Sequence, residues 1–275
     1  MNNILVIGNP TLDFVKGECF GPGGPVTYVV NSLSKLSEKK IHILTSFGED
    51  FSIENFTEKS NLFRIESEFT NKFNFFFKSE IREIHANSYG GKLKVTDLKL
   101  DFTPEMIYIS PVLNEFSILE TKLLMKKFKK SFFIGMPQGW IRKLIADVVR
   151  IDFSDIKKFP FFDILFFSEE EILNTNINIE EFRKLAKILV ITRGHKGSSV
   201  YNGKNTFEFP SKKVKSLNTI GAGDIFATVF SHTFFHSKNI SFAGHLANEI
   251  AAKSTMYKGL KSINSDVFKI AMKRK

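Results

Sequence analysis

Residues 218–224, Asn-Thr-Ile-Gly-Ala-Gly-Asp, combine two glycines with an aspartate and lead directly into an apolar run that can form a helix. Glycine lets the backbone turn tightly and bring its N–H groups close to a ligand. The start of a helix adds unpaired N–H donors and the positive end of the helix dipole. The segment is therefore suited to hold an anion, above all a phosphate, on the N–H groups of Gly221, Ala222 and Gly223.

Asp224 ends this segment, and its carboxylate would repel a bound phosphate unless it has a chemical role there. Accepting the proton of an attacking hydroxyl group is such a role. An aspartate before a helix is also a common N-cap, and one residue can serve both purposes. The chain has no Gly-x-x-x-x-Gly-Lys-Ser/Thr segment, so the phosphate would not be held by the common P-loop.

The composition is that of a globular protein of 275 residues, with 43% hydrophobic and 25% charged residues. A single cysteine, Cys19, excludes an internal disulfide framework and suits a reducing compartment. We expect no signal peptide and no membrane-spanning run, and so a cytoplasmic protein without a membrane partner. The net charge is +10, but the lysines are spread in short clusters without a recognition motif. We therefore expect a solvated surface and no nucleic-acid partner.

Short apolar runs alternate with helical patterns along the chain. Buried strands are expected at residues 4–8, 41–45, 106–110, 132–135, 164–167 and 188–192, and a hairpin at 198–210. Helices are expected at residues 26–36, 115–130, 225–235 and 243–257, the second with Phe116, Leu119, Leu123, Leu124 and Phe128 on one apolar face. This alternation predicts a three-layer α/β/α fold around a mostly parallel central sheet.

Two segments carry a resemblance to a known family. Residues 218–224 resemble the Asp-Thr-x-Gly-Ala-Gly-Asp signature of the ribokinase-like (PfkB) carbohydrate kinases. Residues 192–197, Thr-Arg-Gly-His-Lys-Gly, resemble the Thr-x-Gly-x-x-Gly loop of the same family. Weaker resemblances follow in the family's order at residues 8–13, 21–25, 46–50, 168–171 and 247–259. The resemblance implies a single ribokinase-like kinase domain over residues 1–275.

The resemblance also implies a lid, a small sheet that projects from the main domain and covers the substrate. Residues 12–20 and about 70–97 alternate polar and apolar residues and lack long helical faces, so we assign the lid to them. An ordinary edge of a mixed sheet is the alternative. A homodimer through the lid is also left open.

Individual roles follow from the resemblance alone. Asp224 would be the catalytic base, and the backbone of Gly221, Ala222 and Gly223 would form the anion hole. Asp13 would bind substrate hydroxyl groups, because a carboxylate can accept two such bonds at once; a plain turn residue after Pro10 is the alternative. The remaining assignments are Gly23, Gly24 and Tyr28 for the substrate, Thr192, Gly194, Gly197 and Asn248 for the nucleotide, and Glu171 for Mg²⁺ through water.

At three positions the residue differs from the one in the family's motif, and at a fourth, Arg142, the role is open. Asn218 replaces the first aspartate of the signature, which puts activation by potassium in doubt. Ser168 replaces the asparagine of the family's Asn-x-x-Glu, and Tyr28 replaces a sugar-binding asparagine of ribokinase-type members, which argues against ribose. Arg142 is expected at the surface at the start of a helix, with contact to a phosphate as the alternative.

The sequence thus predicts a kinase that uses ATP and Mg²⁺ and transfers the γ-phosphoryl group to a hydroxyl of a small sugar or polyol. A nucleoside kinase on the same fold is one alternative. A non-catalytic ligand-binding relative is another, favoured by Asn218 and Ser168 and opposed by the retention of Asp224.

Overall fold

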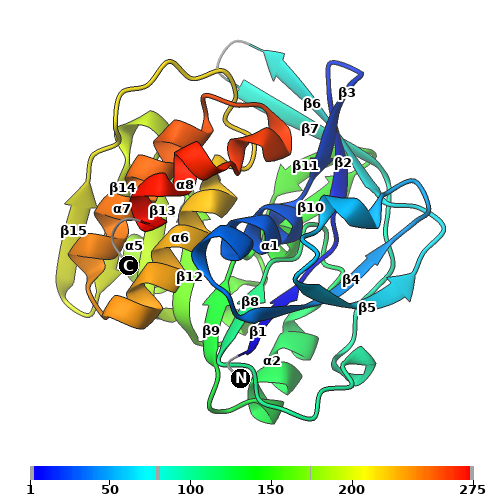
Figure 1. The fold of residues 1–275 in the computed structure, drawn as a ribbon, viewed down its shortest axis with the longest axis horizontal. Helices are drawn as coiled ribbons and strands as arrows, with labels where there is room; N and C mark the ends of the chain where they lie inside the picture. The colour runs from blue at the N-terminus through cyan, green and yellow to red at the C-terminus, as the bar shows by residue number, and fades with distance from the viewer. Residues whose placement is uncertain (1–2, 79–80, 174, 273–275) are drawn as a thin grey trace. The chain divides into compact units, whose positions relative to one another are not determined.

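The computed structural model describes residues 3–78, 81–173 and 175–272, with the elements labelled in Figure 1. The chain forms two compact units. The first contains the residues up to Thr27, Lys39–Phe132 and Pro137–Pro160, and the second contains Tyr28–Glu38, Phe133–Met136 and the residues from Phe161 onward. The helices are α1 (Pro25–Leu36), α2 (Ile118–Lys127), α3 (Gln138–Ile141), α4 (Glu169–Leu173), α5 (Ile179–Arg183), α6 (Ala222–Ser237), α7 (Ile240–Ser254) and α8 (Ser265–Met272).

The large sheet is mostly parallel, and the first unit supplies four of its strands. In spatial order these are β8 (Met106–Ile109), β1 (Asn3–Ile7), β4 (Lys40–Phe47) and β5 (Ser60–Glu66), each parallel to its neighbour. The expected strands at 4–8, 41–45 and 106–110 are confirmed. Strand β5 was not expected, because it is an edge strand on which exposed and half-buried residues alternate without an apolar run.

The second unit supplies β9 (Phe132–Gly135), β12 (Phe162–Ser168), β13 (Ala186–Thr192) and the antiparallel hairpin of β14 (Ser198–Asn202) and β15 (Asn205–Phe209). Helices cover both faces of this part. Phe166 packs against Phe226 of α6, and its neighbour Phe167 packs against Phe182 of α5. Because successive residues of a strand point to opposite faces, the two helices lie on opposite sides, which confirms the three-layer arrangement in this unit.

The smaller sheet lies wholly in the first unit, and we call it the lid sheet. Its order is β10 (Arg142–Ile145), β11 (Val148–Ile151), β7 (Ile81–Ser88), β6 (Asn71–Lys78), β2 (Thr11–Val15) and β3 (Glu18–Gly23). Both predicted lid segments contribute strands, but residues 89–97 contain no strand and end in the short helix η2 (Val95–Asp97). The β10–β11 hairpin was not assigned to the lid, because its residues are largely exposed and carry no buried apolar run.

Helix α2 corrects one prediction. It begins at Ile118, three residues later than expected, because the hydroxyl of Ser117 accepts a hydrogen bond from the N–H of Glu120 and caps the helix. Its buried residues are Thr121 and Leu124, whereas Leu119 and Leu123 are 65% and 46% exposed. The predicted apolar face was therefore wrong at these two leucines.

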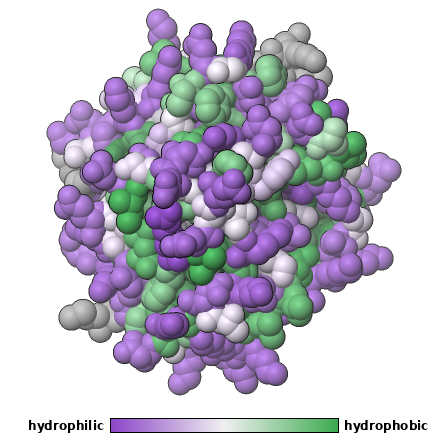
Figure 2. All heavy atoms as spheres, turned by 90° about the vertical axis from the view of Figure 1, so that its right-hand side faces the viewer, coloured by the Kyte–Doolittle hydropathy of each residue, from purple (hydrophilic) through white to green (hydrophobic). Residues whose placement is uncertain are grey.

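The surface is largely hydrophilic, as the charged and polar residues of the composition lead one to expect. Figure 2 shows hydrophilic side chains over most of one face, with hydrophobic side chains between them in separate groups. Among the described residues, no helix has both the length and the apolar character needed to cross a membrane.

Candidate functional site

The turn before α6 has the geometry of an anion-binding site. Gly221 is the N-cap residue with φ of 81°, in the left-handed region, and its cap makes no side-chain hydrogen bond. The N–H of Ala222 donates to Thr219, and the first intrahelical bond joins the N–H of Ile225 to the carbonyl of Gly221. The N–H groups of Gly223 and Asp224 therefore lie at the open end of a 16-residue helix, where the positive end of its dipole is located.

Asp224 is the third residue of α6 and thus not its cap, which is Gly221. Its carboxylate stands in the first helical turn beside the same N–H groups, and the backbone carbonyl of Asp224 accepts a hydrogen bond of 2.7 Å from the hydroxyl of Thr228. A carboxylate-bearing residue and the N-terminal N–H groups of a helix therefore lie within four residues.

Besides its left-handed φ, Gly221 has a second feature that makes any side chain at this position strained. A Cβ atom at this position would overlap the ring of Tyr28, which is 1% exposed in α1. The ring of Tyr28 therefore packs against this turn, and its predicted role in binding substrate stays a prediction.

Asn218, the departure from the family signature, also shapes this turn. Its side-chain oxygen accepts a hydrogen bond of 3.1 Å from the N–H of Ile220, which is the usual geometry of an Asx turn. Its backbone N–H donates to the carbonyl of Thr255 at the end of α7. The amide thus fixes the chain two residues before the glycine turn begins.

A second group of predicted residues comes together in the first unit, at the start of the lid sheet. Asp13 is 2% exposed, and its Oδ1 accepts a hydrogen bond of 2.6 Å from the hydroxyl of Thr11. A Cβ atom on Gly23 would overlap the carboxylate of Asp13, and Gly24 has φ of 82° beside Thr11. We call Thr11, Asp13, Gly23 and Gly24 the carboxylate cradle.

Long-range hydrogen bonds hold the chain that enters this cradle, and the sequence did not reveal them. The side chain of Asn9 donates to the carbonyl of Gly91 and accepts from the N–H of Ser46. Asn71 donates to the carbonyl of Pro10. Each partner lies tens of residues away, so no local pattern identifies these amides as functional.

Glu115 also holds the chain that leads into the carboxylate cradle. Its buried carboxylate accepts hydrogen bonds from the backbone N–H groups of Asn9, Val112 and Leu113, at 2.8–3.0 Å. Burial raises the pKa of Glu115, and these N–H donors oppose the shift. The carboxylate therefore ties the loop after β8 to the loop that leads to Asp13.

Glu171 and Ser168 form a capping box at the start of α4. A carboxylate oxygen of Glu171 accepts from the N–H of Ser168, and the hydroxyl of Ser168 accepts from the N–H of Glu171, at 2.8 Å and 3.2 Å. Serine is therefore a sound substitute for the asparagine of the family motif as far as the helix is concerned. Within the described residues no cluster of three or more His, Cys, Asp or Glu side chains could hold a metal ion directly.

The loop after β13 contains Thr192, Gly194 and Gly197. The N–H of Arg193 donates to Gly197, and the N–H of Gly197 donates to Gly194, which closes a tight turn. Gly197 has φ of 104°, and a Cβ atom there would overlap the carbonyl of Phe209. The glycine therefore lets the turn pack directly against β15.

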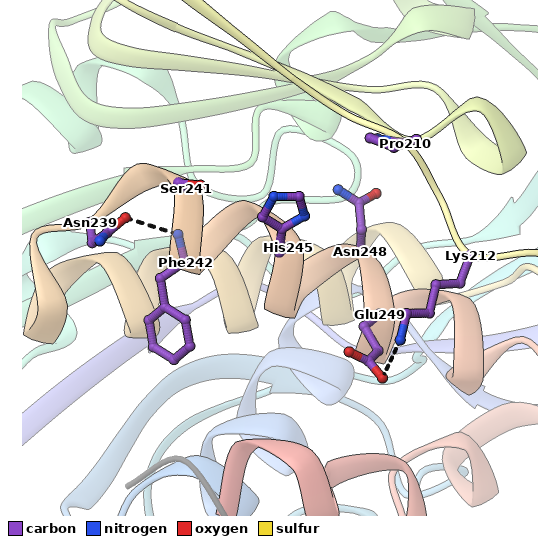
Figure 3. Close-up of a pocket in the computed structure, with 8 residues that line it drawn as sticks. All are labelled: Pro210, Lys212, Asn239, Ser241, Phe242, His245, Asn248 and Glu249. Atoms are coloured by element: carbon purple, nitrogen blue, oxygen red, sulfur yellow. Dashed lines mark hydrogen bonds and ion pairs between the residues drawn. The ribbon is translucent and has the colours of Figure 1, made fainter.

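Asn248 lies in α7 at the wall of a pocket of about 490 Å³, shown in Figure 3. Its side-chain N–H₂ group donates to the hydroxyl of Ser198 and to the carbonyl of Gly244. Glu249 forms ion pairs with Lys212 at 2.6 Å and with Lys253. Burial raises the pKa of Glu249, but hydrogen bonding to Lys212 and the nearby lysine charges outweigh it, so the pKa is lowered. The pocket wall thus combines polar and apolar groups; its residues are Pro210, Lys212, Asn239, Ser241, Phe242, His245, Asn248 and Glu249.

Comparison with known proteins relates these features to a family. Residues 144–266, which include the glycine turn and α7, match the pfkB family carbohydrate kinase model. A stretch of 72 residues is 38% identical to the 5-dehydro-2-deoxygluconokinase of Listeria innocua. This stretch is 26% of the chain and spans only 22% of the length of that relative.

Solved structures agree over nearly the whole chain at low identity. A pyrophosphate-dependent kinase in the ribokinase family, complexed with a pyrophosphate analog and myo-inositol, has a TM-score of 0.80 at 21% identity, covering 97% of this chain and 99% of that one. Ribokinase from Thermotoga maritima has a TM-score of 0.74 at 21% identity, covering 99% and 100%. The fold is therefore ribokinase-like, and residues 144–266 are similar to the pfkB family of carbohydrate kinases.

Proposed function

We propose that this chain is a kinase that transfers a phosphoryl group to a hydroxyl of a small sugar or polyol. The observation that carries the proposal is the turn at Gly221, which places the start of one long helix and the carboxyl-bearing Asp224 within the same helical turn. An anion site alone would not need a carboxylate beside it, because the negative charge opposes binding of the phosphate.

The proposed step is an in-line displacement at phosphorus. The oxygen of the acceptor hydroxyl forms a bond to phosphorus, its proton passes to Asp224, and the bond between phosphorus and the leaving phosphate breaks. The N–H groups of Gly221 and Gly223 stabilise charge on the transferred group, and the predicted part of the Ala222 N–H requires it to leave its bond to Thr219. Asp13 and the backbone at Gly24 bind the acceptor, and the lid sheet excludes water that would compete for the phosphoryl group.

Glu171 is the residue that would help to hold Mg²⁺, and its surroundings fit that role. One carboxylate oxygen engages the N–H of Ser168, and the side chain is 9% exposed in an acidic first turn. Carboxylates and water are the ligands that Mg²⁺ prefers. When bound, the ion would neutralise charge on the phosphates of the donor.

The phosphoryl donor is ATP in our first proposal, with Thr192, Gly194, Gly197 and Asn248 beside the nucleotide. The pocket next to Asn248 favours pyrophosphate as a second candidate. Both donors of the Asn248 amide are already used within the protein, and the ring of Phe209 packs against Gly244 in the same wall. A purine base prefers an apolar slot with a few open polar groups, and this wall carries a lysine–glutamate ion pair instead.

A donor and acceptor matrix tests the proposal. The protein is incubated with Mg²⁺ and either ATP or pyrophosphate, and with simple sugars, inositol or the nucleosides adenosine, cytidine and inosine. Release of ADP or orthophosphate that depends on a sugar or polyol supports the proposal. Turnover with nucleosides alone would make the chain a nucleoside kinase, and binding without any turnover would make it a non-catalytic relative.

A homodimer through the lid sheet is part of the proposal. Strand β10 is an edge of this sheet, and the exposed Ile145 and Ile151 lie on its hairpin. The mass in solution, measured by light scattering, tests the pairing, and Ile145→Lys should shift a dimer towards monomer.

A further inference from the structure

Glu115 is a buried carboxylate that the proposed phosphoryl transfer does not use. It is 4% exposed, and its two oxygens accept hydrogen bonds from the backbone N–H groups of Asn9, Val112 and Leu113. Burial raises its pKa, and the groups that oppose this shift are backbone N–H donors, with no positively charged side chain among them in the described part of the chain. A buried charge without a cationic partner is costly, so these N–H bonds must offset a large desolvation penalty.

Closure of its own loop accounts for only part of these bonds. Two of the donors belong to the loop of Glu115 itself, three and two positions before it. Asn114 has φ of 55°, in the left-handed region, and this turn folds residues 110–116, which we call the β8 loop, back on itself. The third donor, Asn9, lies 106 positions away, in the segment that follows β1. A glutamate that only closed the β8 loop would not have to reach Asn9.

The β8 loop also holds two other segments that connect to the lid sheet. The carbonyl of Glu115 accepts a hydrogen bond of 2.8 Å from the N–H of Leu93, in the chain that leaves β7. The carbonyl of Phe116 accepts one of 2.7 Å from the indole N–H of Trp140 in α3, and α3 runs directly into β10. Three segments that enter or leave the lid sheet are therefore fixed on one loop, and Glu115 binds two of them.

Asn9 connects this loop to the carboxylate cradle. Only Pro10 separates it from Thr11, whose hydroxyl donates to Asp13. A Cβ atom on Gly24 would lie 3.1 Å from the carbonyl oxygen of Asn9 and 3.0 Å from the backbone nitrogen of Thr11, so the backbone of Gly24 packs directly on this segment. A displacement of Asn9 therefore has to move Thr11 and Gly24 with it.

We propose that Glu115 is a positioning residue for the acceptor. By fixing Asn9 it keeps the carboxylate cradle in the geometry that binds hydroxyl groups, without touching the substrate itself. The inference rests on the proposed kinase function and adds a residue to its acceptor side. The competing role is that Glu115 only braces the β8 loop, in which case its replacement would lower the stability of the protein and spare acceptor binding.

Three variants separate positioning from stability. Glu115→Gln keeps the size of the side chain but turns an N–H₂ group towards backbone N–H donors, so at least one of the bonds is lost. Glu115→Asp keeps the charge with a shorter reach. Asp163→Asn is the matched control, because Asp163 is a half-buried carboxylate that also accepts a bond of 2.8 Å from a backbone N–H, that of Phe133 in β9 of the second unit.

Steady-state kinetics use the donor that supports turnover and the acceptor with the highest rate among the simple sugars and inositol. We expect Glu115→Gln to lower kcat/KM for the acceptor roughly 10- to 100-fold, mainly through KM, because misplacement of a bound group by about 1 Å can cost this much. The donor KM should stay nearly unchanged. Glu115→Asp should give an intermediate acceptor KM, whereas Asp163→Asn should lower Tm and keep the acceptor KM of the wild type.

Hydrogen–deuterium exchange of residues 8–15 reports on the cradle without turnover. These amides should exchange faster in Glu115→Gln, less so in Glu115→Asp, and at the wild-type rate in Asp163→Asn. If Glu115→Gln does not fold, the comparison of Glu115→Asp with Asp163→Asn answers the same question.

Two results count against the inference, and a third counts against the proposed function. Wild-type exchange of residues 8–15, or an unchanged acceptor KM, would reduce Glu115 to a brace of the β8 loop. A wild type that phosphorylates none of the compounds would overturn the kinase proposal, and the exchange rates would then decide alone whether Glu115 positions the cradle.

Discussion

The glycine turn at residues 218–224 and the carboxylate cradle around Asp13 are built in opposite ways. In the turn, most bonds are local: Ile220 donates to Asn218, and Ala222 donates to Thr219. Near the cradle, the N–H of Asn9 donates to a residue 106 positions away, and its side chain donates to one 82 positions away. A site that depends on local backbone geometry can be recognised from a short sequence motif. A site that depends on hydrogen bonds between distant residues can be recognised only in the folded structure.

The two regions also bind in different ways. The turn offers backbone N–H groups at an open helix end, and Gly223 is exposed. The cradle offers one side-chain carboxylate that is almost fully buried and already bonded to Thr11. We therefore expect substitutions in the turn to act on the rate of the chemical step, and substitutions in the cradle to act on binding of the acceptor.

The largest effect is expected from Asp224→Asn. Without a group that accepts the proton, kcat should fall by on the order of 10²–10⁴ while the affinity for the donor stays nearly unchanged. Steady-state kinetics with either donor measure both quantities. Asp266→Asn is a matched control, since Asp266 also stands in the first turn of a helix, α8. Near-normal turnover of Asp224→Asn would remove the base from the mechanism and leave the turn as a binding site only.

The second-largest effect is on the free energy of unfolding, and it compares substitutions at two glycines of the turn. Gly221→Ala places a Cβ atom in the left-handed region, which costs about 1–2 kcal/mol, and against the Tyr28 ring, which adds about 1–3 kcal/mol from overpacking. Gly223→Ala meets no atom within 4 Å and should leave the free energy of unfolding unchanged or raise it. Urea unfolding compares the two variants, and equal stability would show that the turn adapts.

The third effect tests the cradle. Asp13→Ala removes hydrogen bonds between a charged group and the acceptor, worth about 1.5–3 kcal/mol, so the acceptor KM should rise roughly 10- to 150-fold. The donor KM should change little. Asp50→Ala is the control, because Asp50 accepts hydrogen bonds from Thr70 and pairs with Lys72, so its loss should lower stability and spare acceptor binding. Equal weakening of both substrates by Asp13→Ala would assign Asp13 to the fold.

These contrasts also explain what the sequence could predict. The parallel strands, the β14–β15 hairpin and the place of Asp224 next to a helix start follow from apolar runs, turn residues and one short motif, although α6 begins at Ala222, three residues before the predicted start at 225. Strand β5 and the β10–β11 hairpin were missed because edge strands are half exposed and bury no apolar run. Glu115 was missed because its partners lie in two separate loops. Arg142 was expected at a helix start but opens β10, an edge strand without a buried apolar run, and its guanidinium lies 5.6 Å from the Phe73 ring centre, a contact between distant residues that no local pattern signals.

The smallest effect concerns the one position where the turn departs from the family signature. An aspartate at position 218 would add a negative charge to a potassium site, whereas the amide of Asn218 offers a neutral oxygen that already accepts a bond from Ile220. Hard cations prefer charged oxygen ligands, so potassium should be held weakly. Activity should depend on Mg²⁺ and change little when sodium replaces potassium at constant ionic strength.

Asn218→Asp sharpens this last prediction. An aspartate can keep the bond to the N–H of Ile220 and adds the missing charge, so the variant should fold normally and gain a dependence on potassium. Initial rates in potassium and sodium chloride, for the wild type and the variant, measure the gain. A strong potassium requirement in the wild type would instead mean that backbone carbonyls form the cation site. The turn would then resemble the cradle after all, with its chemistry supplied by partners that the short motif does not contain.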